Sequence, residues 1–274
     1  MRNIAGHKSE ANKNPMSLVE KSVTDTVGTI MLADPAKRNA LSGVLIKELM
    51  EALAEMADLR VRVVILRAAK GSQVWSAGHD VRELPTNGRD PLTYNDPLRQ
   101  LVRAIKRAPV PIVAMVEGGV WGGACEVVMN CDFIVAAETA TFAITPAKLG
   151  VPYDIAGVLN FMQVVPLPVM KEMLFTAKPI PADRALQVGL VNHVVPAERL
   201  ETITAELAEQ MSRNSPLVIG LLKEELRILA GSAPLSPEAF ERIQALRRRI
   251  YDSVDYQEGI KSFFEKRAPR FQGK

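Results

Sequence analysis

Two glycine-containing turns carry the residues of this chain that are best suited to chemistry. The first is Ser76-Ala77-Gly78-His79-Asp80, and the second runs from Gly118 to Glu126 and includes four glycines. Glycine lets the backbone approach a ligand without an intervening side chain, and the first turn of a helix has amide N–H groups with no partner inside the helix. One N–H from each turn would make an oxyanion hole with two donors. The alternative for the second turn, taken alone, is that it only lets a helix pack close to a sheet.

The segments that flank these turns predict how they are held. Apolar runs at 61–67 and 112–116 precede the two turns and are typical of β-strands, while the residues after Gly123 favour a helix. Upstream, the pattern predicts a hairpin at 17–23 and 27–33 and helices at 42–59 and 97–107. The proline, glycine and charge at 83–96 indicate a long loop.

The order strand, strand, helix then repeats along the chain. Further strands are expected at 132–137, 139–144 and 190–195. From residue 155 onward helical patterns dominate, at 155–164, 169–176, 182–188, 197–213, 216–230, 236–252 and 256–267. The fold class is therefore α/β with a helical C-terminal part.

These motifs also carry a family resemblance. With Arg38-Asn39-Ala40-Leu41-Ser42 before the two turns, the chain resembles the crotonase (enoyl-CoA hydratase/isomerase) superfamily over roughly residues 17–272. Within it, the chain is most similar to the branch that decarboxylates methylmalonyl-CoA, through Gly78-His79-Asp80, Glu83-Leu84-Pro85, Gly88-Arg89-Asp90-Pro91-Leu92, Asp96-Pro97-Leu98-Arg99-Gln100, Val120-Trp121-Gly122-Gly123, Leu149-Gly150-Val151-Pro152-Tyr153 and Tyr251-Asp252-Ser253.

The resemblance implies an organisation in three parts. A flexible N-terminal extension at 1–15 would precede a crotonase-type ββα spiral core at 16–200, which binds acyl-CoA. A helical oligomerisation region would follow at 201–274. The resemblance also implies a homotrimer or homohexamer whose terminal helices pack on a neighbouring subunit.

The chemistry implied by the resemblance is the decarboxylation of methylmalonyl-CoA to propionyl-CoA. Carried over by position, the oxyanion-hole donors are the backbone N–H groups of His79 and Gly123. Loss of CO2 leaves a thioester enolate, whose charge those donors would stabilise. No metal, biotin or other cofactor is then required, since coenzyme A is part of the substrate, and the sequence shows no clustered metal-ligand set.

Glu126 lies where a hydratase-like relative has one of its two catalytic carboxylates. The second carboxylate would fall at Pro146, and proline cannot transfer a proton. Hydration is therefore disfavoured, and Glu126 is either a catalytic residue or a helix-start carboxylate with local hydrogen bonds. Two alternatives stay open: a hydratase or isomerase that acts on another acyl-CoA, and a catalytically silent binding module with this fold.

The resemblance places further polar residues near the acyl group. Tyr153 would orient the substrate carboxylate, and Thr145 is a weaker candidate for the same pocket. Trp75 and Trp121 would supply an apolar surround that solvates the carboxylate poorly. The imidazole of His79 is either packed or helps to orient the substrate.

For coenzyme A, the resemblance points to three cationic side chains and one backbone segment. Lys37 and Arg38 would lie near the nucleotide phosphates, and Lys266 would reach in from the C-terminal helix, of the same or a neighbouring subunit. The backbone segment that would bind consists of Ala77, Gly78, His79, Asp80 and Val81.

Composition limits the class of protein. The net charge of the 274 residues is only +3, so no nucleic-acid partner is indicated. Apolar residues form no run of about twenty, which argues against a membrane partner. Cys125 and Cys131 lie in apolar segments and are expected to be reduced, and residues 1–15 lack a secretory signal pattern. A cytoplasmic location is therefore expected.

Overall fold

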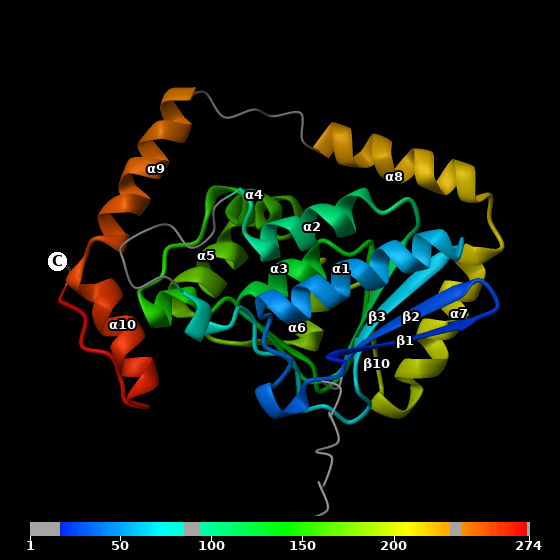
Figure 1. Ribbon diagram of the computed structural model, residues 1–274, viewed down its shortest axis with the longest axis horizontal. Helices are drawn as coiled ribbons and strands as arrows, with labels where there is room; N and C mark the ends of the chain where they lie inside the picture. The colour runs from blue at the N-terminus through cyan, green and yellow to red at the C-terminus, as the bar shows by residue number, and fades with distance from the viewer. Residues whose placement is uncertain (1–16, 85–93, 231–236, 273–274) are drawn as a thin grey trace, which may run out of the picture.

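Two β-sheets organise the computed structural model, which describes residues 17–84, 94–230 and 237–272 (Figure 1). The larger sheet has six strands in the order β1-β2-β3-β5-β7-β10. Only β1 and β2 are antiparallel, and the other neighbours are parallel. The bounds of these strands are Val19–Thr24, Val27–Leu32, Val63–Ala68, Ile112–Val116, Phe133–Ala137 and His193–Val195.

A smaller sheet continues the same chain path. Its order is β4-β6-β8-β9, with bounds Val74–Ser76, Gly119–Trp121, Thr141–Ala143 and Ile180–Pro181. Each of β3, β5 and β7 is followed by a strand of the smaller sheet, and a helix then returns the chain. These helices are α2 (Pro97–Arg107), α3 (Gly123–Met129) and α4 (Ile155–Val164). The α/β class and the repeat of strand, strand and helix are confirmed.

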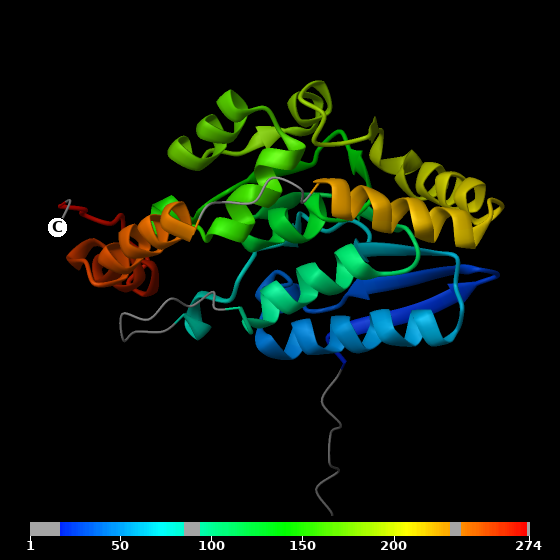
Figure 2. The same ribbon diagram turned by 90° about the horizontal axis from the view of Figure 1, so that it is seen from above.

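The larger sheet is buried on both faces, and its sequence shows why. Along β3, Val64 and Leu66 pack with the helices on one face, whereas Val63 and Ile65 pack on the other. The first face is covered by α1 (Gly43–Asp58) with α2 and α3. The second is covered by α7 (Leu200–Ser212). Figure 2 shows α1 alongside the β1–β2 hairpin.

Local capping explains where α1 and α2 begin. The Ser42 hydroxyl accepts from Leu45 N at the start of α1. The Asp96 carboxylate accepts from Leu98 N, and Pro97 occupies the first helical position, where its missing N–H costs nothing. The start of α2 is thereby held against the two glycine turns.

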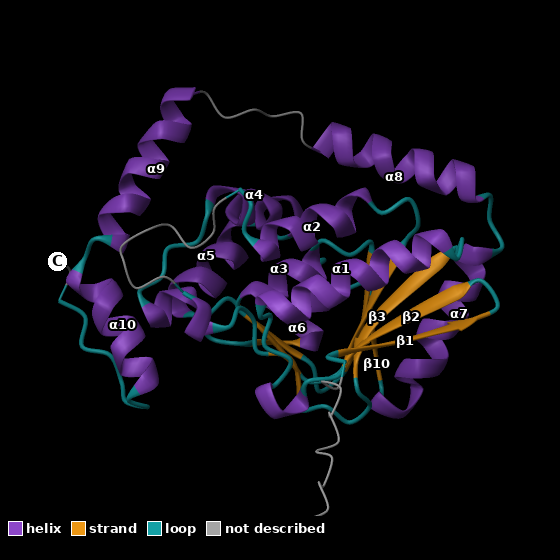
Figure 3. Ribbon diagram, viewed as in Figure 1, coloured by secondary structure: helices purple, strands orange, loops and turns teal. Residues whose placement is uncertain are grey.

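The C-terminal region is helical as expected. It contains α8 (Pro216–Ala230), α9 (Pro237–Tyr251) and α10 (Val254–Phe264), and Figure 3 shows these helices apart from the strands. The expected division at residues 200 and 201 falls at the start of α7, which packs on the larger sheet. Residues 1–15 and most of the predicted loop at 83–96 lie outside the described residues.

Contacts of α10 are made with its own chain. A Cβ on Gly259 would lie 1.9 Å from Leu149 O, so α10 approaches the short helix η3 (Pro146–Leu149) as closely as only glycine allows. Tyr251, Tyr256 and Ile260 form a small core with Val151. The last helices therefore pack against η3 and the segment that follows it. Within the described residues, no helix is both long and apolar enough to span a membrane.

Shorter elements complete the described chain. They are the helices α5 (Leu167–Thr176) and α6 (Ala182–Gln187), and the 3-10 turns η1 (Pro35–Lys37), η2 (Val81–Glu83) and η4 (Ala197–Arg199).

Candidate active site

The two glycine turns lie side by side. Gly78 has a φ of +86°, and a Cβ on it would lie 2.4 Å from Trp121 O and 3.0 Å from Gly123 N. A Cβ on Gly123 would in turn lie 3.5 Å from His79 N. Within the described residues, neither His79 N nor Gly123 N donates a hydrogen bond to the protein. Two adjacent N–H groups are therefore available to one acceptor, as an oxyanion hole needs.

The segment before the first turn holds it in place. Ala77 N donates to Arg38 O at 2.9 Å, and Leu41 N donates to Gly78 O at 2.8 Å. The buried Asn39 side chain donates to Trp75 O, also at 2.9 Å. The motif 38–42 and the turn 76–80 thus form one hydrogen-bonded unit.

A cavity of about 80 Å³ opens beside these donors, and we call it the acyl cavity. Its size suits a short acyl group. Neither Trp75 nor Trp121 lines it, so the predicted tryptophan surround is wrong: Trp75 is fully buried and its indole N–H donates to Met115 O. The lining residues are Ala77, His79, Val81, Leu84, Leu98, Gly122, Gly123, Glu126, Thr145, Pro146, Leu149, Val151, Pro152 and Tyr153.

Glu126 is fully buried at the wall of the acyl cavity and is held by residues from other helices. Arg99 forms a bidentate ion pair with it, with Nη2 3.0 Å from Oε2. Tyr153 Oη and Asn160 Nδ2 each donate to Glu126 at 3.2 Å. Of the two alternatives for Glu126, a carboxylate with only local hydrogen bonds is therefore excluded. Its oxygens already accept from three residues, which leaves few lone pairs for a water molecule.

Tyr153 lines the acyl cavity as expected, but its hydroxyl is directed at Glu126. Burial and the charge of Glu126 raise the pKa of Tyr153 well above its usual value, so the phenol stays protonated. A hydroxyl has one hydrogen. While it donates to Glu126, it offers a substrate only its lone pairs and ring edge.

Thr145 and Pro146 also line the acyl cavity. Pro146 starts η3, and its carbonyl accepts from Val151 N at 3.1 Å. Pro146, at the position expected for a second hydratase carboxylate, thus lies at the acyl cavity and contributes an apolar ring to its wall. Among the lining residues, Glu126 is the carboxylate.

The His79 side chain lines the acyl cavity, and its Nδ1 is buried without a hydrogen-bond partner in the described structure. Nearby, burial raises the pKa of Asp96, whereas the charge of His79 acts in the opposite direction. The imidazole is thus packed between the cavity and the start of α2.

The residues predicted to bind coenzyme A are more dispersed. Lys37 and Arg38 are exposed, and Arg38 is joined to the first turn through its carbonyl. Lys266 is exposed just after α10. The Asp80 carboxylate does not line the acyl cavity; it pairs with Arg82, which lowers its pKa.

Two of the partners of Glu126, Arg99 and Asn160, were not predicted from the sequence. Arg99 pairs with Asp154 as well as Glu126, and Asn160 follows on α4. An acidic residue inside the apolar run of α3 needs a buried cation, which is the one signal that could have pointed to Arg99. Within the described chain, no group of three or more His, Cys, Asp or Glu side chains could hold a metal ion.

Known proteins resemble this chain over nearly all of its length. Residues 22–274 match the profile of enoyl-CoA hydratase/isomerase. Methylmalonyl-CoA decarboxylase of Escherichia coli (strain K12) is 52% identical over 237 residues, which are 86% of this chain and 91% of that protein. The mitochondrial enoyl-CoA hydratase domain-containing protein 3 of Mus musculus is 34% identical over an alignment of 281 positions that covers 97% of this chain and 86% of that protein.

Solved structures give the same result. Methylmalonyl-CoA decarboxylase in complex with 2-nitronate-propionyl-CoA superposes with a TM-score of 0.92 at 49% identity, covering 94% of this chain and 99% of that one. A complex with 2S-carboxypropyl CoA has the same TM-score and identity, covering 94% and 98%. The chain therefore belongs to the enoyl-CoA hydratase/isomerase, or crotonase, family.

Proposed function

We propose that this protein decarboxylates methylmalonyl-CoA to propionyl-CoA. The observation that carries the proposal is a pair of N–H groups, His79 N and Gly123 N, that donate to no group of the described residues and lie beside a small cavity whose carboxylate is ion-paired. The relatives named as methylmalonyl-CoA decarboxylases, one with 2-nitronate-propionyl-CoA bound, support this substrate.

The thioester oxygen accepts hydrogen bonds from both N–H groups. The bond between the α carbon and the carboxylate breaks, its electron pair becomes the enolate, and CO2 leaves. A proton then adds to the α carbon and gives propionyl-CoA, so the reaction consumes one proton. Because the donors are in place beforehand, each is worth about 10²–10³ in rate. We propose that this enolate needs no cofactor beyond the coenzyme A of the substrate.

The walls of the acyl cavity would promote the step in which the charged carboxylate of the substrate leaves as neutral CO2. Leu98, Leu149 and Val151 give the carboxylate of the substrate few hydrogen-bond donors. A charged carboxylate is poorly solvated there, whereas neutral CO2 is not. Tyr153 contacts the same space and limits where the carboxylate can lie.

Hydration of an enoyl-CoA is the second candidate. It requires one carboxylate to activate water and another to move the proton, but Pro146 and the ion-paired Glu126 leave neither group free. A silent binding module is disfavoured by the open oxyanion hole.

We further infer that copies of the chain associate as a trimer or hexamer in the cytoplasm. The α8 helix turns a row of large apolar side chains toward solvent: Val218 is 53%, Leu222 49% and Leu226 67% exposed. These residues are spaced by four and share one face of the helix. Large apolar side chains that are exposed together on one face of a helix are typical of a protein interface.

One paired assay tests the function. Purified protein is given methylmalonyl-CoA, and CO2 and propionyl-CoA are measured; crotonyl-CoA hydration is measured in parallel. Decarboxylation without hydration supports the proposal. Hydration alone favours the second candidate, and the absence of both activities favours the binding module.

A further inference from the structure

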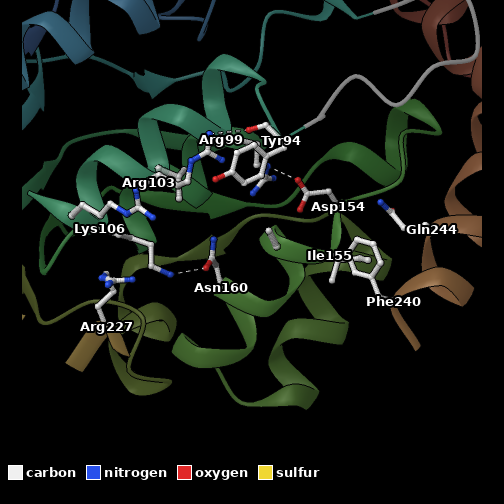
Figure 4. Close-up of a pocket in the computed structure, with 13 residues that line it drawn as sticks. Tyr94, Arg99, Arg103, Lys106, Asp154, Ile155, Asn160, Arg227, Phe240 and Gln244 are labelled. Atoms are coloured by element: carbon white, nitrogen blue, oxygen red, sulfur yellow. Dashed lines mark hydrogen bonds and ion pairs between the residues drawn. The ribbon is translucent and has the colours of Figure 1, made fainter. Parts of the chain in front are cut away.

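A larger cavity lies on the other side of the Arg99–Glu126 pair. It has a volume of about 410 Å³ and is bordered by α2, α4, α8 and α9 (Figure 4). None of its described lining residues is shared with the acyl cavity. We call it the basic cavity, because five of its described lining side chains are cationic and only Asp154 is anionic.

Three of these cations have no carboxylate partner among the described residues. Arg103, Lys106 and Arg107 lie on one face of α2, and no ion pair involves them. Arg99 is matched by Glu126 and Asp154, and Arg227 of α8 is matched by Glu224. Like charges at this spacing destabilise a helix slightly, and only Lys106 and Arg107 gain from the helix C-terminus.

The cations also converge from two helices. Burial lowers the pKa of Lys106, and the charge of Arg227 lowers it further. Lys106 Nζ donates to Asn160 Oδ1 at 3.0 Å, which fixes its position without neutralising it. A positive charge that is partly desolvated beside a second positive charge is stabilised by a bound anion.

The other end of the basic cavity is different in character. In Figure 4, Arg103, Lys106 and Arg227 lie toward one side, whereas Ile155, Phe240 and Gln244 lie toward the other. A ligand that fits both ends has a multiply charged anionic group and an apolar or flat organic part. Arg103 also donates to Tyr94 O at 2.8 Å and stacks on the Tyr94 ring, which positions its guanidinium without neutralising it. Three cations with no carboxylate partner among the described residues suit a phosphate dianion better than a single carboxylate.

We propose that the basic cavity is a second binding site, for an organic phosphate. The phosphate binds between Arg103, Lys106, Arg107 and Arg227, and the organic part lies against Ile155 and Phe240. The ligand's phosphate could belong to a free metabolite or to the coenzyme A of a substrate molecule, and the variants below distinguish these sources.

Isothermal titration calorimetry of the full-length protein tests the site with two probes, inorganic phosphate and AMP. AMP is expected to bind more tightly than phosphate, because only AMP reaches the apolar end. Lys106→Gln and Arg103→Gln are each expected to weaken both probes by about tenfold to a hundredfold. Lys106→Gln keeps a side chain that can contact Asn160. If Lys106→Gln does not fold, Arg107→Gln at an exposed position replaces it in the test.

The matched control is Lys47→Gln, an exposed lysine of α1 that lines neither the acyl cavity nor the basic cavity and should leave binding of the probes unchanged, whereas Lys37→Gln reports binding at the proposed coenzyme A site. The proposal is overturned if wild type binds neither probe at millimolar concentration, or if Lys106→Gln, Arg103→Gln and Arg107→Gln bind as wild type does. If Lys37→Gln alone loses binding of the probes, the phosphate binds at the proposed coenzyme A site instead. Since binding is read without turnover, this test is independent of the decarboxylase proposal.

Discussion

Arg99 and Glu126 form a bidentate ion pair that is closed to solvent, with side chains only 6% and 0% exposed. Asp154 lies on the other side of the guanidinium. Burial would lower the pKa of Arg99, but the charges of Glu126 and Asp154 outweigh it and raise the pKa. Arg99 therefore keeps its charge and fixes the carboxylate of Glu126 toward Tyr153, and the pair lies between the acyl cavity and the basic cavity.

Removing this guanidinium should be costly. In Arg99→Met, two buried carboxylates lose their cation, and the free energy of unfolding is expected to fall by about 3–5 kcal/mol. Urea unfolding measures the change. Arg99→Met combined with Glu126→Gln should recover part of the loss, because one unpaired charge is removed. A loss below about 1 kcal/mol in the single variant would show that the pair does not stabilise the fold.

Gly123 tests the oxyanion hole. Gly123→Pro removes one donor at the first position of α3, where proline is well tolerated in helices. The rate is expected to fall by about 10²–10³. A Cβ here would lie 2.8 Å from Leu98 Cδ2, so Gly123→Ala is the control: it adds the same carbon but keeps the N–H. Equal rates in the two variants would contradict the assignment.

Tyr153 tests how the carboxylate of the substrate is positioned. Tyr153→Phe keeps the ring, which packs against Phe161 at a centroid distance of 5.3 Å, but loses the hydroxyl. The hydroxyl that is lost donates to Glu126, and a hydrogen bond to a charged group is worth roughly 1.5–3 kcal/mol, so a loosened cavity wall is expected to lower the decarboxylation rate by up to about one to two decades. Binding of propionyl-CoA, which has no carboxylate, should change little. An unchanged decarboxylation rate would remove Tyr153 from the mechanism.

Much of the fold, and the two glycine turns that lie side by side, could be predicted from local patterns. The strands before each turn are apolar runs. A side chain on Gly78 would collide with the second turn, and one on Gly123 would press on Leu98 of α2. Glycine marks such positions in the sequence, because a residue with a side chain does not fit where the backbone approaches other groups so closely.

The partners of Glu126 could not be predicted in this way. Arg99, Tyr153 and Asn160 come from α2, the loop before α4 and α4 itself, so their meeting depends on how three helices pack. The two tryptophans show the same limit: Trp75 lies in the core and Trp121 is half-buried, and neither lines the acyl cavity.

The apolar face of α8 predicts self-association. Sedimentation at micromolar concentration should show trimers or hexamers, and Leu222→Glu with Leu226→Glu should shift the protein to monomers, because buried glutamates at an apolar interface are unfavourable. Val44→Glu, an equally exposed apolar position on α1 at 60% exposure, is the control and should not change the assembly. A monomeric wild type would count against the inference.

Pro146 separates the two enzymatic candidates. Pro146→Glu adds a carboxylate to the acyl cavity, close to where the substrate carboxylate must lie. Two like charges there disfavour binding of the charged substrate, so decarboxylation is expected to fall. Pro146→Gln has nearly the same shape without the charge and should be affected less.

Hydration should not appear in Pro146→Glu, because Arg99, Tyr153 and Asn160 still occupy Glu126. The measurement is methylmalonyl-CoA decarboxylation and crotonyl-CoA hydration, side by side, in wild type and both variants. If wild type hydrates crotonyl-CoA and releases no CO2, the decarboxylase proposal is wrong. If Pro146→Glu gains strong hydratase activity, then Glu126 is free to act as a base, and its ion pair with Arg99 does not lock it.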